Sequence, residues 1–213
     1  MLERNQLKKI WLQVPPEYYE KGIKSNLLQK NWHEGKWRMV KSLARGKYRR
    51  ILDVGCASGW LTARMAHLYP KAEVFGIDVS EKMCHKAKAI HPEVKFIQAD
   101  AHKLPFEKGS LDLIIATEVL EHVVDPLVVL LEMKWVLSKS GEIIISMDTG
   151  NILFNAIWFF WTRGKGRVWK NSHLHRFNVR KLRQLFLKAG FYVEKEQIFN
   201  FGLAVAFKLR KVR

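Results

Sequence analysis

The sequence predicts an α/β protein built on a mostly parallel sheet with helices on both of its faces. Apolar, strand-like runs alternate with segments of helical composition between residues 51 and 147, and this alternation is typical of βα units. The run at residues 111–116 is apolar almost throughout, as expected for a strand that is buried on both faces. With 213 residues, the chain is long enough for one such domain with a full hydrophobic core.

The first predicted strand, residues 51–54, leads into a turn that contains Gly55 and Gly59 and then into a helix at residues 62–68. A strand, a glycine-containing turn and a helix form the first half of a nucleotide-binding unit. Glycine lets the backbone approach a ligand closely and adopt a positive φ, and the N–H groups at the helix start face the same crevice. This turn is therefore the first candidate for a cofactor site.

The spacing within the turn disfavours a dinucleotide cofactor. The dinucleotide fingerprint requires glycine at position 57 and glycine or alanine at position 60, where this chain has Ala57 and Trp60. A pyrophosphate would then meet an indole at a position that needs close packing of helix and strand. We therefore disfavour an oxidoreductase of the NAD-dependent kind.

The second and third predicted strands, residues 73–78 and 94–98, each lead to an acidic residue. Asp78 ends the second strand, where a carboxylate can accept hydrogen bonds from both hydroxyls of a ribose. The alternative role is a helix cap, and Ser80 competes for that position. Asp100 follows the third strand, and its ordinary alternative is a turn residue.

The fourth strand, residues 111–116, is followed by Thr117 and then by Glu118-Val119-Leu120-Glu121-His122-Val123. Glu118 and His122 are four positions apart, so on a helix they would share one face at the mouth of the crevice. The remaining elements of this region are predicted helices at residues 81–90 and 126–137 and a fifth strand at residues 141–147.

Together these motifs resemble those of the class I S-adenosylmethionine-dependent methyltransferases. The family motif D-x-G-x-G-x-G is matched by Asp53, Gly55 and Gly59, with Ala57 in place of the middle glycine. The other matches are residues 101–106, which resemble the family's A-x-x-L-P-F stretch, and residues 111–123, which resemble its F-D-x-V-x-x-x-x-V-L-E-H run.

The resemblance covers about residues 49–147 firmly and continues more weakly to residue 191. It implies a Rossmann-like class I methyltransferase fold, a seven-stranded sheet in the order 3-2-1-4-5-7-6 with helices on both faces. The remaining elements would be a helix at residues 179–189 capped by Asn178 and strands at residues 191–199 and 203–209, the seventh being antiparallel.

The resemblance also implies the cofactor and its contacts. The methyl donor would be S-adenosylmethionine, with Asp78 on the ribose hydroxyls, Asp100 on the adenine amino group and the Ala101 amide on a ring nitrogen. The expected cofactor-binding residues are Asp53, Gly55, Cys56, Ala57, Gly59, Trp60, Asp78, Val79, Asp100, Ala101, Thr117 and Glu118.

The expected reaction is in-line displacement at the sulfonium carbon, in which the protein's main task is to align the acceptor with the methyl group. A hydroxyl, an acidic carbon or a protonated nitrogen as acceptor would also need a base. His122 is the leading candidate, followed by Glu118, His173 and His175; the alternative for His122 is a residue that bonds the pocket backbone. We expect no metal, because the sequence offers no further ligand near His173 and His175.

Charge is distributed unevenly along the chain, whose formal net charge is +17. Residues 1–50 carry 13 basic and 4 acidic side chains, residues 51–150 carry 10 and 14, and residues 151–213 carry 14 and 2. The mildly acidic middle suits a cofactor with a sulfonium, whereas the basic flanks favour a polyanionic partner. The candidates are a nucleic acid such as RNA, an anionic lipid surface and a phosphorylated small molecule; the alternative is a lysine-rich surface without a partner.

The resemblance implies that residues 1–213 form a single methyltransferase domain, with residues 1–45 as an N-terminal helical cover over the cofactor. Two helices are expected there, at residues 18–30 and 35–44. The residues expected to face the cofactor from this cover are Trp32, His33 and Arg38.

Residues 148–177 occupy the place of a substrate-recognition insertion in this family. Residues 152–161 are aromatic and apolar and precede a basic loop with Arg163, Lys165 and Arg167. An apolar helix beside a basic loop is typical of a segment that lies at a membrane surface. Burial against the N-terminal helices is the equally weighted alternative.

The sequence therefore predicts an S-adenosylmethionine-dependent methyltransferase with a small or lipid-like acceptor, anionic with an apolar part, and with possible peripheral membrane contact. The alternatives are an RNA methyltransferase and a non-catalytic S-adenosylmethionine-binding protein; the oligomeric state does not follow from the sequence. The polar start of the chain, the absence of a membrane-spanning run, and Cys56 and Cys84, which need not pair, favour a cytoplasmic location.

Overall fold

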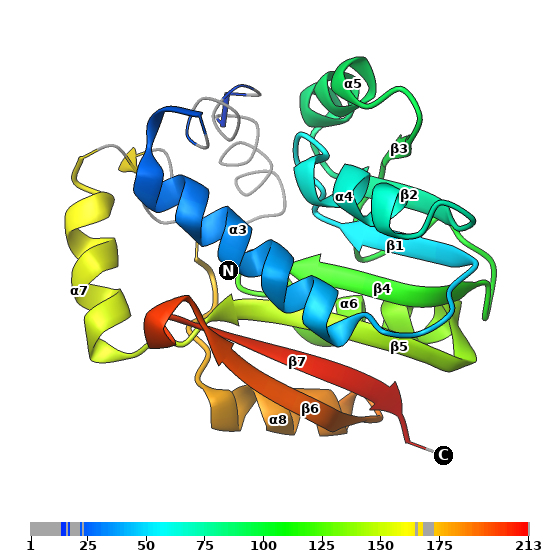
Figure 1. The fold of residues 1–213 in the computed structure, drawn as a ribbon. Helices are drawn as coiled ribbons and strands as arrows, with labels where there is room; N and C mark the ends of the chain where they lie inside the picture. The colour runs from blue at the N-terminus through cyan, green and yellow to red at the C-terminus, as the bar shows by residue number, and fades with distance from the viewer. Residues whose placement is uncertain are drawn as a thin grey trace.

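The computed structural model describes residues 14–15, 17, 22, 24–164, 166–167 and 173–212. Within this part of the chain the strands form one seven-stranded sheet in the order β3-β2-β1-β4-β5-β7-β6 (Figure 1). The strands are β1 Arg50–Val54, β2 Glu73–Asp78, β3 Lys95–Gln98, β4 Leu111–Thr117, β5 Leu137–Asp148, β6 Phe191–Phe199 and β7 Ala204–Lys211. Strands β1 to β5 pair in parallel, and β7 pairs antiparallel with both β5 and β6. The strand order predicted from the sequence is confirmed.

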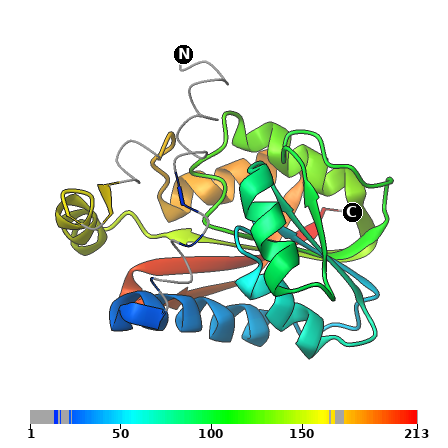
Figure 2. The same ribbon diagram turned by 90° about the horizontal axis from the view of Figure 1, so that it is seen from above.

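Helices cover both faces of this sheet, as Figure 2 shows from a second direction. They are α3 Leu27–Leu43, α4 Trp60–Leu68, α5 Glu81–Ile90, α6 Pro126–Val136 and α8 Val179–Lys188. A further helix, α7, spans Ile152–Trp161, and a short 3-10 turn, η2, spans Asn200–Gly202.

Side-chain alternation along the strands separates two hydrophobic layers. Ile51 of β1 and Ile144 of β5 belong to one layer, whereas their neighbours Leu52 and Ile143 belong to the other, because successive residues of a strand point to opposite faces. Helices α3 and α4 pack on the first layer, and α6 and α8 pack on the second. The central strands are therefore buried on both faces, as their apolar sequences predict.

Several helices begin at the caps that the sequence supplies. The side chains of Ser80, Asp125 and Asn178 accept hydrogen bonds from backbone N–H groups in the first turns of α5, α6 and α8. Such caps satisfy donors that have no partner within the helix. Ser80, rather than Asp78, caps α5, which leaves the Asp78 carboxylate available for other contacts.

The N-terminal part differs from the prediction of two helices. One continuous helix, α3, runs from Leu27 to Leu43, with Asn26 as its cap. Gly35, which we expected to begin a second helix, lies inside α3, where a Cβ atom would come within 1.7 Å of Asn200 Oδ1. The glycine therefore permits close approach to η2 and does not interrupt the helix. Tyr18 and Tyr19, at the start of the other predicted helix, lie outside the described residues.

The segment after β4 was also predicted wrongly. Residues 118–124 form turns and bends, and helix α6 begins only at Pro126. Glu118 has a φ of 57°, in the left-handed region that ends a strand sharply and cannot continue into a helix. Its N–H bonds to the Ser146 carbonyl of β5, so pairing within the sheet outweighs the helical spacing of Glu118 and His122.

Helix α7 stands apart from the sheet in both views (Figures 1 and 2). Of its residues only Phe154 is buried, whereas Ile152 is 90% exposed and Phe160 is 72% exposed. The sequence left open that this segment is buried against the N-terminal helices. Most of the α7 side chains are not buried, so this alternative does not hold for them. Within the described residues, no helix combines the length and apolar character needed to cross a lipid bilayer.

Candidate functional site

A cavity of about 1030 Å³ opens at the carboxyl ends of β1, β2 and β4. It lies beside the point where the strand order reverses between β1 and β4, which is where open α/β sheets bind ligands. Lys36 of α3, Trp158 of α7 and Phe201 of η2 line its other walls. Small-molecule sites commonly measure about 300–1,000 Å³, so this cavity has room for a cofactor and a second molecule.

The glycine-containing turn forms the floor of the cavity. Gly55, Ala57 and Gly59 have φ values of 70°, 47° and 81°, so the turn adopts three left-handed conformations in five residues. Alanine tolerates this conformation less well than glycine, and Ala57 is the position where the sequence departs from the family motif. The Ala57 N–H donates a hydrogen bond to Asp78 Oδ2 over 2.9 Å, which fastens the turn to the end of β2.

Gly59 has a structural role that differs from the one expected. It does not line the cavity but forms the N-cap of α4. A Cβ atom there would lie 2.5 Å from Cζ of Phe96, so glycine allows the start of α4 to lie close to this side chain of β3. The other eleven residues expected to bind the cofactor all line the cavity.

The two aspartates at the ends of β1 and β2 are held in different ways. Asp53 is 2% exposed and accepts a hydrogen bond from Thr62 Oγ1 at 2.6 Å; burial raises its pKa to about 7. Asp78 accepts from the N–H groups of Ala57 and Ser80. Burial raises the pKa of Asp78, and these hydrogen bonds partly oppose that effect.

Asp100 is held by contacts within the turn that follows β3. Asp100 Oδ1 accepts a hydrogen bond from the His102 N–H and lies 2.6 Å from His102 Nδ1. It therefore shapes the turn after β3 while it lines the cavity.

Burial raises the pKa of the Cys56 thiol well above its usual value, so the thiol stays protonated and is a poor nucleophile.

Glu118 binds α3 to the edge of the cavity. Its carboxylate accepts hydrogen bonds from Trp32 Nε1 at 2.7 Å and from Lys36 Nζ at 2.9 Å. Burial raises its pKa, but the charge and hydrogen bond of Lys36 outweigh this and lower the pKa to about 2. Glu118 is therefore ionised at neutral pH, which makes it a weak base and a strong electrostatic partner for a cation.

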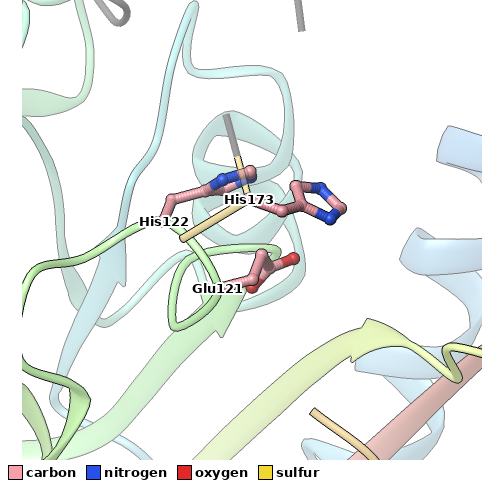
Figure 3. A group of neighbouring side chains, drawn as sticks. All are labelled: Glu121, His122 and His173. Atoms are coloured by element: carbon pink, nitrogen blue, oxygen red, sulfur yellow. The ribbon is translucent and has the colours of Figure 1, made fainter. Parts of the chain in front are cut away.

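His122 and His173 meet at one end of the cavity, although 51 positions separate them in the sequence. Their ring centroids are 4.9 Å apart, and Glu121 lies directly beside them (Figure 3). Trp158 of α7 stacks on the His173 ring with a centroid distance of 4.5 Å. We call Glu121, His122 and His173 the histidine cluster.

Burial dominates the ionisation of the groups in and beside the histidine cluster. It lowers the pKa of His173 to about 4 and raises that of the neighbouring Asp148 to about 6. It also raises the pKa of Glu121 well above its usual value, helped by the charges of Glu118 and Asp148. The neutral imidazole of His173 therefore lies beside two carboxyl groups, Glu121 in the cluster and Asp148 next to it, that lack full solvation.

His175 does not join this cluster. Its Nε2 atom donates a hydrogen bond to the Val123 carbonyl at 2.9 Å, and its ring stacks on Phe177. It is not among the residues that line the cavity. These contacts give His175 a structural role in fastening the segment after α7 to the turn that follows β4.

Sequence reasoning did not single out four residues that shape the site, Lys36, Glu121, Asp148 and Trp158, although the last two lie in the predicted substrate-recognition insertion. Glu121 follows directly from the matched V-L-E-H run and could have been noticed there. The others reach the cavity only through tertiary contacts, as the 82-residue separation of Lys36 and Glu118 illustrates. The expected cover residues Trp32, His33 and Arg38 do line the cavity.

The lining of the cavity is acidic, although the whole chain is strongly basic. Among the described lining residues, six are acidic (Asp53, Asp78, Asp100, Glu118, Glu121 and Asp148) and two are basic (Lys36 and Arg38). Lys36 is already paired with Glu118. Burial raises the pKa of Asp53, Asp78, Glu121 and Asp148, whereas Glu118 stays ionised. An acidic lining of this kind favours a cationic ligand group, which would also keep the buried carboxyl groups ionised.

Residues 52–145 match the family model described as a methyltransferase domain. A malonyl-[acyl-carrier protein] O-methyltransferase of Halalkalibacterium halodurans is 33% identical over 109 residues, which are 48% of this chain and 40% of the relative. A demethylmenaquinone methyltransferase of Staphylococcus aureus is 38% identical over 116 residues, 53% of this chain and 48% of the relative. The chain thus matches about half or less of the length of these curated relatives.

Solved structures share the fold over nearly the whole chain. The magnesium protoporphyrin IX methyltransferase of Synechocystis PCC 6803, solved with bound SAH, has a TM-score of 0.75 at 16% identity and covers 98% of this chain and 100% of its own. An S-adenosylmethionine-dependent methyltransferase of Thermotoga maritima, described as a possible histamine N-methyltransferase, has a TM-score of 0.74 at 21% identity and covers 96% and 99%.

Proposed function

We propose that this chain, in which residues 52–145 match a methyltransferase domain, is a class I S-adenosylmethionine-dependent methyltransferase that transfers a methyl group to a small, apolar or lipid-like acceptor. One observation carries the proposal. A single cavity joins the glycine-containing turn and the acids at the strand ends to an aromatic wall formed by α7.

The strand-end side of the cavity would hold the donor. Asp78 would accept hydrogen bonds from the ribose hydroxyls, and Asp100 with the Ala101 amide would contact the adenine. The positive sulfonium would be stabilised by the acidic lining, above all by Glu118, which is held ionised by Lys36. The remaining cofactor contacts would come from Asp53, Gly55, Cys56, Ala57, Trp60, Val79 and Thr117, with Gly59 acting through the shape of the turn.

The α7 side would hold the acceptor. Phe154, Trp158 and Trp161 of α7 and Phe201 of η2 present aromatic surface to the cavity, which suits an apolar molecule. In the reaction the acceptor atom forms a bond to the methyl carbon while the carbon–sulfur bond breaks, and S-adenosylhomocysteine leaves. The chain contributes mainly alignment of the two molecules, since the sulfonium is already activated.

The groups best placed to accept a proton from the acceptor are the imidazoles of His122 and His173, at the end of the cavity between the β4 turn and α7. We assign no proton-accepting role to Glu118, whose oxygens are bonded to Trp32 and Lys36. We assign none to His175, which bonds the Val123 carbonyl.

The exposed side of α7 would bring the chain to a membrane surface. Ile152, Leu153 and Phe160 are 90%, 57% and 72% exposed, and the exposed Arg163 and Arg167 follow them. Apolar side chains beside basic residues bind an anionic bilayer through both burial and charge. The basic flanks would attract an anionic acceptor or lipid headgroup to the same place.

The test of the reaction is transfer of a radiolabelled methyl group from S-adenosylmethionine to apolar small molecules, anionic vesicles or RNA. We expect label in the apolar or lipid fraction, at least tenfold less with Trp158→Ala, and no loss with Trp135→Ala, which changes a tryptophan of α6 that is 55% exposed. Label in RNA alone would support the RNA alternative. Cofactor binding without transfer to any acceptor would support a non-catalytic binding protein.

The test of the membrane contact is co-sedimentation with anionic vesicles over a salt series, beside RNA gel shifts over the same series. We expect part of the vesicle binding to resist salt, because apolar burial is not screened. Phe160→Ser should weaken that part, whereas Leu187→Ser, at a 68% exposed position of α8, should not. Tight RNA binding without vesicle binding at any salt concentration would contradict the membrane proposal.

A further inference from the structure

We propose that Glu121, His122 and His173 form a binding site for a divalent transition-metal ion at the acceptor end of the cavity. Each offers one potential ligand atom, and these atoms all lie within 4.8 Å of one another (Figure 3). The residues come from two separate segments, the turn after β4 and the stretch before α8. The sequence suggested no metal because His173 lacks ligands nearby in the chain, but the fold brings two to it.

The donor set has a defined chemistry. Two imidazoles and one carboxylate are the protein ligands of many catalytic zinc sites and of non-haem iron sites, where further positions stay open to water or substrate. Ligand atoms about 2.0–2.2 Å from one ion lie roughly 3.3–3.6 Å apart in such geometry. The cluster therefore needs to contract by about 1 Å, a movement within the reach of side-chain rotation.

Glu121 supplies the second, independent observation. The residue is 2% exposed, and among the described residues its Oε2 atom has no hydrogen-bond partner. An unpartnered buried carboxylate oxygen is costly, and a cation or a proton must compensate it. Lys36, a basic side chain that lines the cavity, is bound to Glu118, so it is not available for this purpose.

The surroundings of His173 would orient it as a ligand. Its Nδ1 atom is 3.8 Å from Asp148 Oδ2, and Trp158 stacks on its ring. A carboxylate opposite one ring nitrogen commonly fixes the orientation of a metal-binding imidazole and raises its basicity. The aromatic stack limits rotation of the ring out of the cavity.

The role of the ion rests on the proposed methyl transfer and narrows its acceptor class. An ion on these ligands would bind an acceptor oxygen and lower the pKa of that hydroxyl. With the ring nitrogens of His122 and His173 bound to the ion, the proton would pass to solvent and not to these imidazoles. The oxyanion would form the new oxygen–carbon bond, and the carbon–sulfur bond would break. The site thus indicates O-methylation of an apolar molecule that carries an acidic hydroxyl, such as a phenol or an enol.

The binding test uses the full chain, stripped of metal and titrated calorimetrically with Zn²⁺, together with Co²⁺ absorption spectra. We expect one tight Zn²⁺ site and the visible bands of Co²⁺ in a low-symmetry nitrogen–oxygen site. His173→Ala and His122→Ala should each weaken Zn²⁺ binding at least tenfold. His85→Ala is the matched control, because it removes an exposed histidine that faces Glu81 on α5, and it should change the affinity less than twofold.

Binding of S-adenosylhomocysteine to the metal-free chain separates this proposal from the proposed function. If the cofactor product binds but Zn²⁺ affinity is the same in the wild type, His173→Ala and His122→Ala, the metal site is refuted and the methyltransferase proposal stands. If Zn²⁺ binds through the cluster but the product does not bind, the metal site stands without the reaction. Thermal unfolding checks each variant, and Glu121→Gln replaces any that does not fold.

Discussion

The contact of Lys36 with Glu118 holds α3 at the edge of the cavity, and its strength can be worked out from the structure. Lys36 Nζ lies 2.9 Å from Glu118 Oε2, and the two side chains are 8% and 30% exposed. Replacement of Lys36 by methionine keeps much of the side-chain volume but leaves the carboxylate without its charged partner. We expect Lys36→Met to destabilise the fold and to loosen α3 from the cavity.

The pKa of Glu118 gives the scale of this effect. A fall from 4.5 to about 2 corresponds to roughly 3 kcal/mol, at 1.36 kcal/mol for each pH unit. Partial exposure of Glu118 reduces this value, so we expect Lys36→Met to lower the free energy of unfolding by about 2–3 kcal/mol at pH 7. Because the folded-state pKa is below the unfolded one, this stabilisation is present above pH 4.5 and is lost as the pH falls towards 2.

Urea unfolding of Lys36→Met, Glu118→Gln and the double variant measures the interaction as a double-mutant cycle. We expect a coupling energy of about 1.5 kcal/mol or more at pH 7. The control is the ion pair of Lys95 with Glu73, whose side chains are 62% and 45% exposed, and which should give a clearly smaller coupling because solvent screens it. A coupling for Lys36 and Glu118 no larger than that of the control would refute the reasoning.

The remaining predictions concern the glycine-containing turn and the two aspartates. Gly59→Ala should lower the melting temperature more than Gly109→Ala. Both glycines have a positive φ, but the added Cβ would lie 2.5 Å from Phe96 at Gly59 and 4.0 Å from its nearest neighbour at Gly109. Equal falls in melting temperature would show that packing is not the cause. Asp78→Ala should weaken S-adenosylhomocysteine binding about tenfold or more in calorimetry, and an unchanged affinity would remove its ribose role. The pKa of Asp53 is raised to about 7 in the folded protein, so the stability of the fold should fall as the pH rises from about 4 to 7 and Asp53 has to ionise while buried. Asp53→Asn should lose less stability over this range in thermal unfolding, and a pH profile identical to that of the wild type would argue against this role.

The strands of the sheet could be predicted because the sequence pattern that marks a strand lies within the strand itself. Strands such as β1 and β4 are short apolar runs, and the order of the strands followed from the resemblance of the motifs to those of the methyltransferase family. The strand order, the cap at Asn178 and the antiparallel β7 are all confirmed. Burial on both faces and the period of the side chains leave few alternatives for such runs.

The two errors arose where tertiary contacts override local pattern. Gly35 looked like a break between helices, yet it lies within α3 because Asn200 needs the space. The spacing of Glu118 and His122 suited a helix, yet the Glu118 N–H pairs with Ser146 of β5. Neither partner is near in the sequence, so no local rule could identify it.

Part of the candidate site could be predicted because it, too, follows from the local sequence of the strands. Residues that follow the strands, such as Asp78 and Asp100, could be placed because strand ends share one edge of the sheet. The histidine cluster depends on how the stretch before α8 folds back over the β4 turn, where the N–H groups of Leu174 and His175 bond the Glu121 carbonyl. Such pairing depends on the whole fold and has no signature in the sequence.

Calorimetric titration of the chain with S-adenosylhomocysteine and, separately, with NAD tests the central claim most directly. The cavity, with its acidic lining and with Trp60 in place of a small residue, predicts saturable one-to-one binding of S-adenosylhomocysteine and no binding of NAD. Tight binding of NAD, with none of S-adenosylhomocysteine, would contradict the assignment of the cavity to a methyl donor.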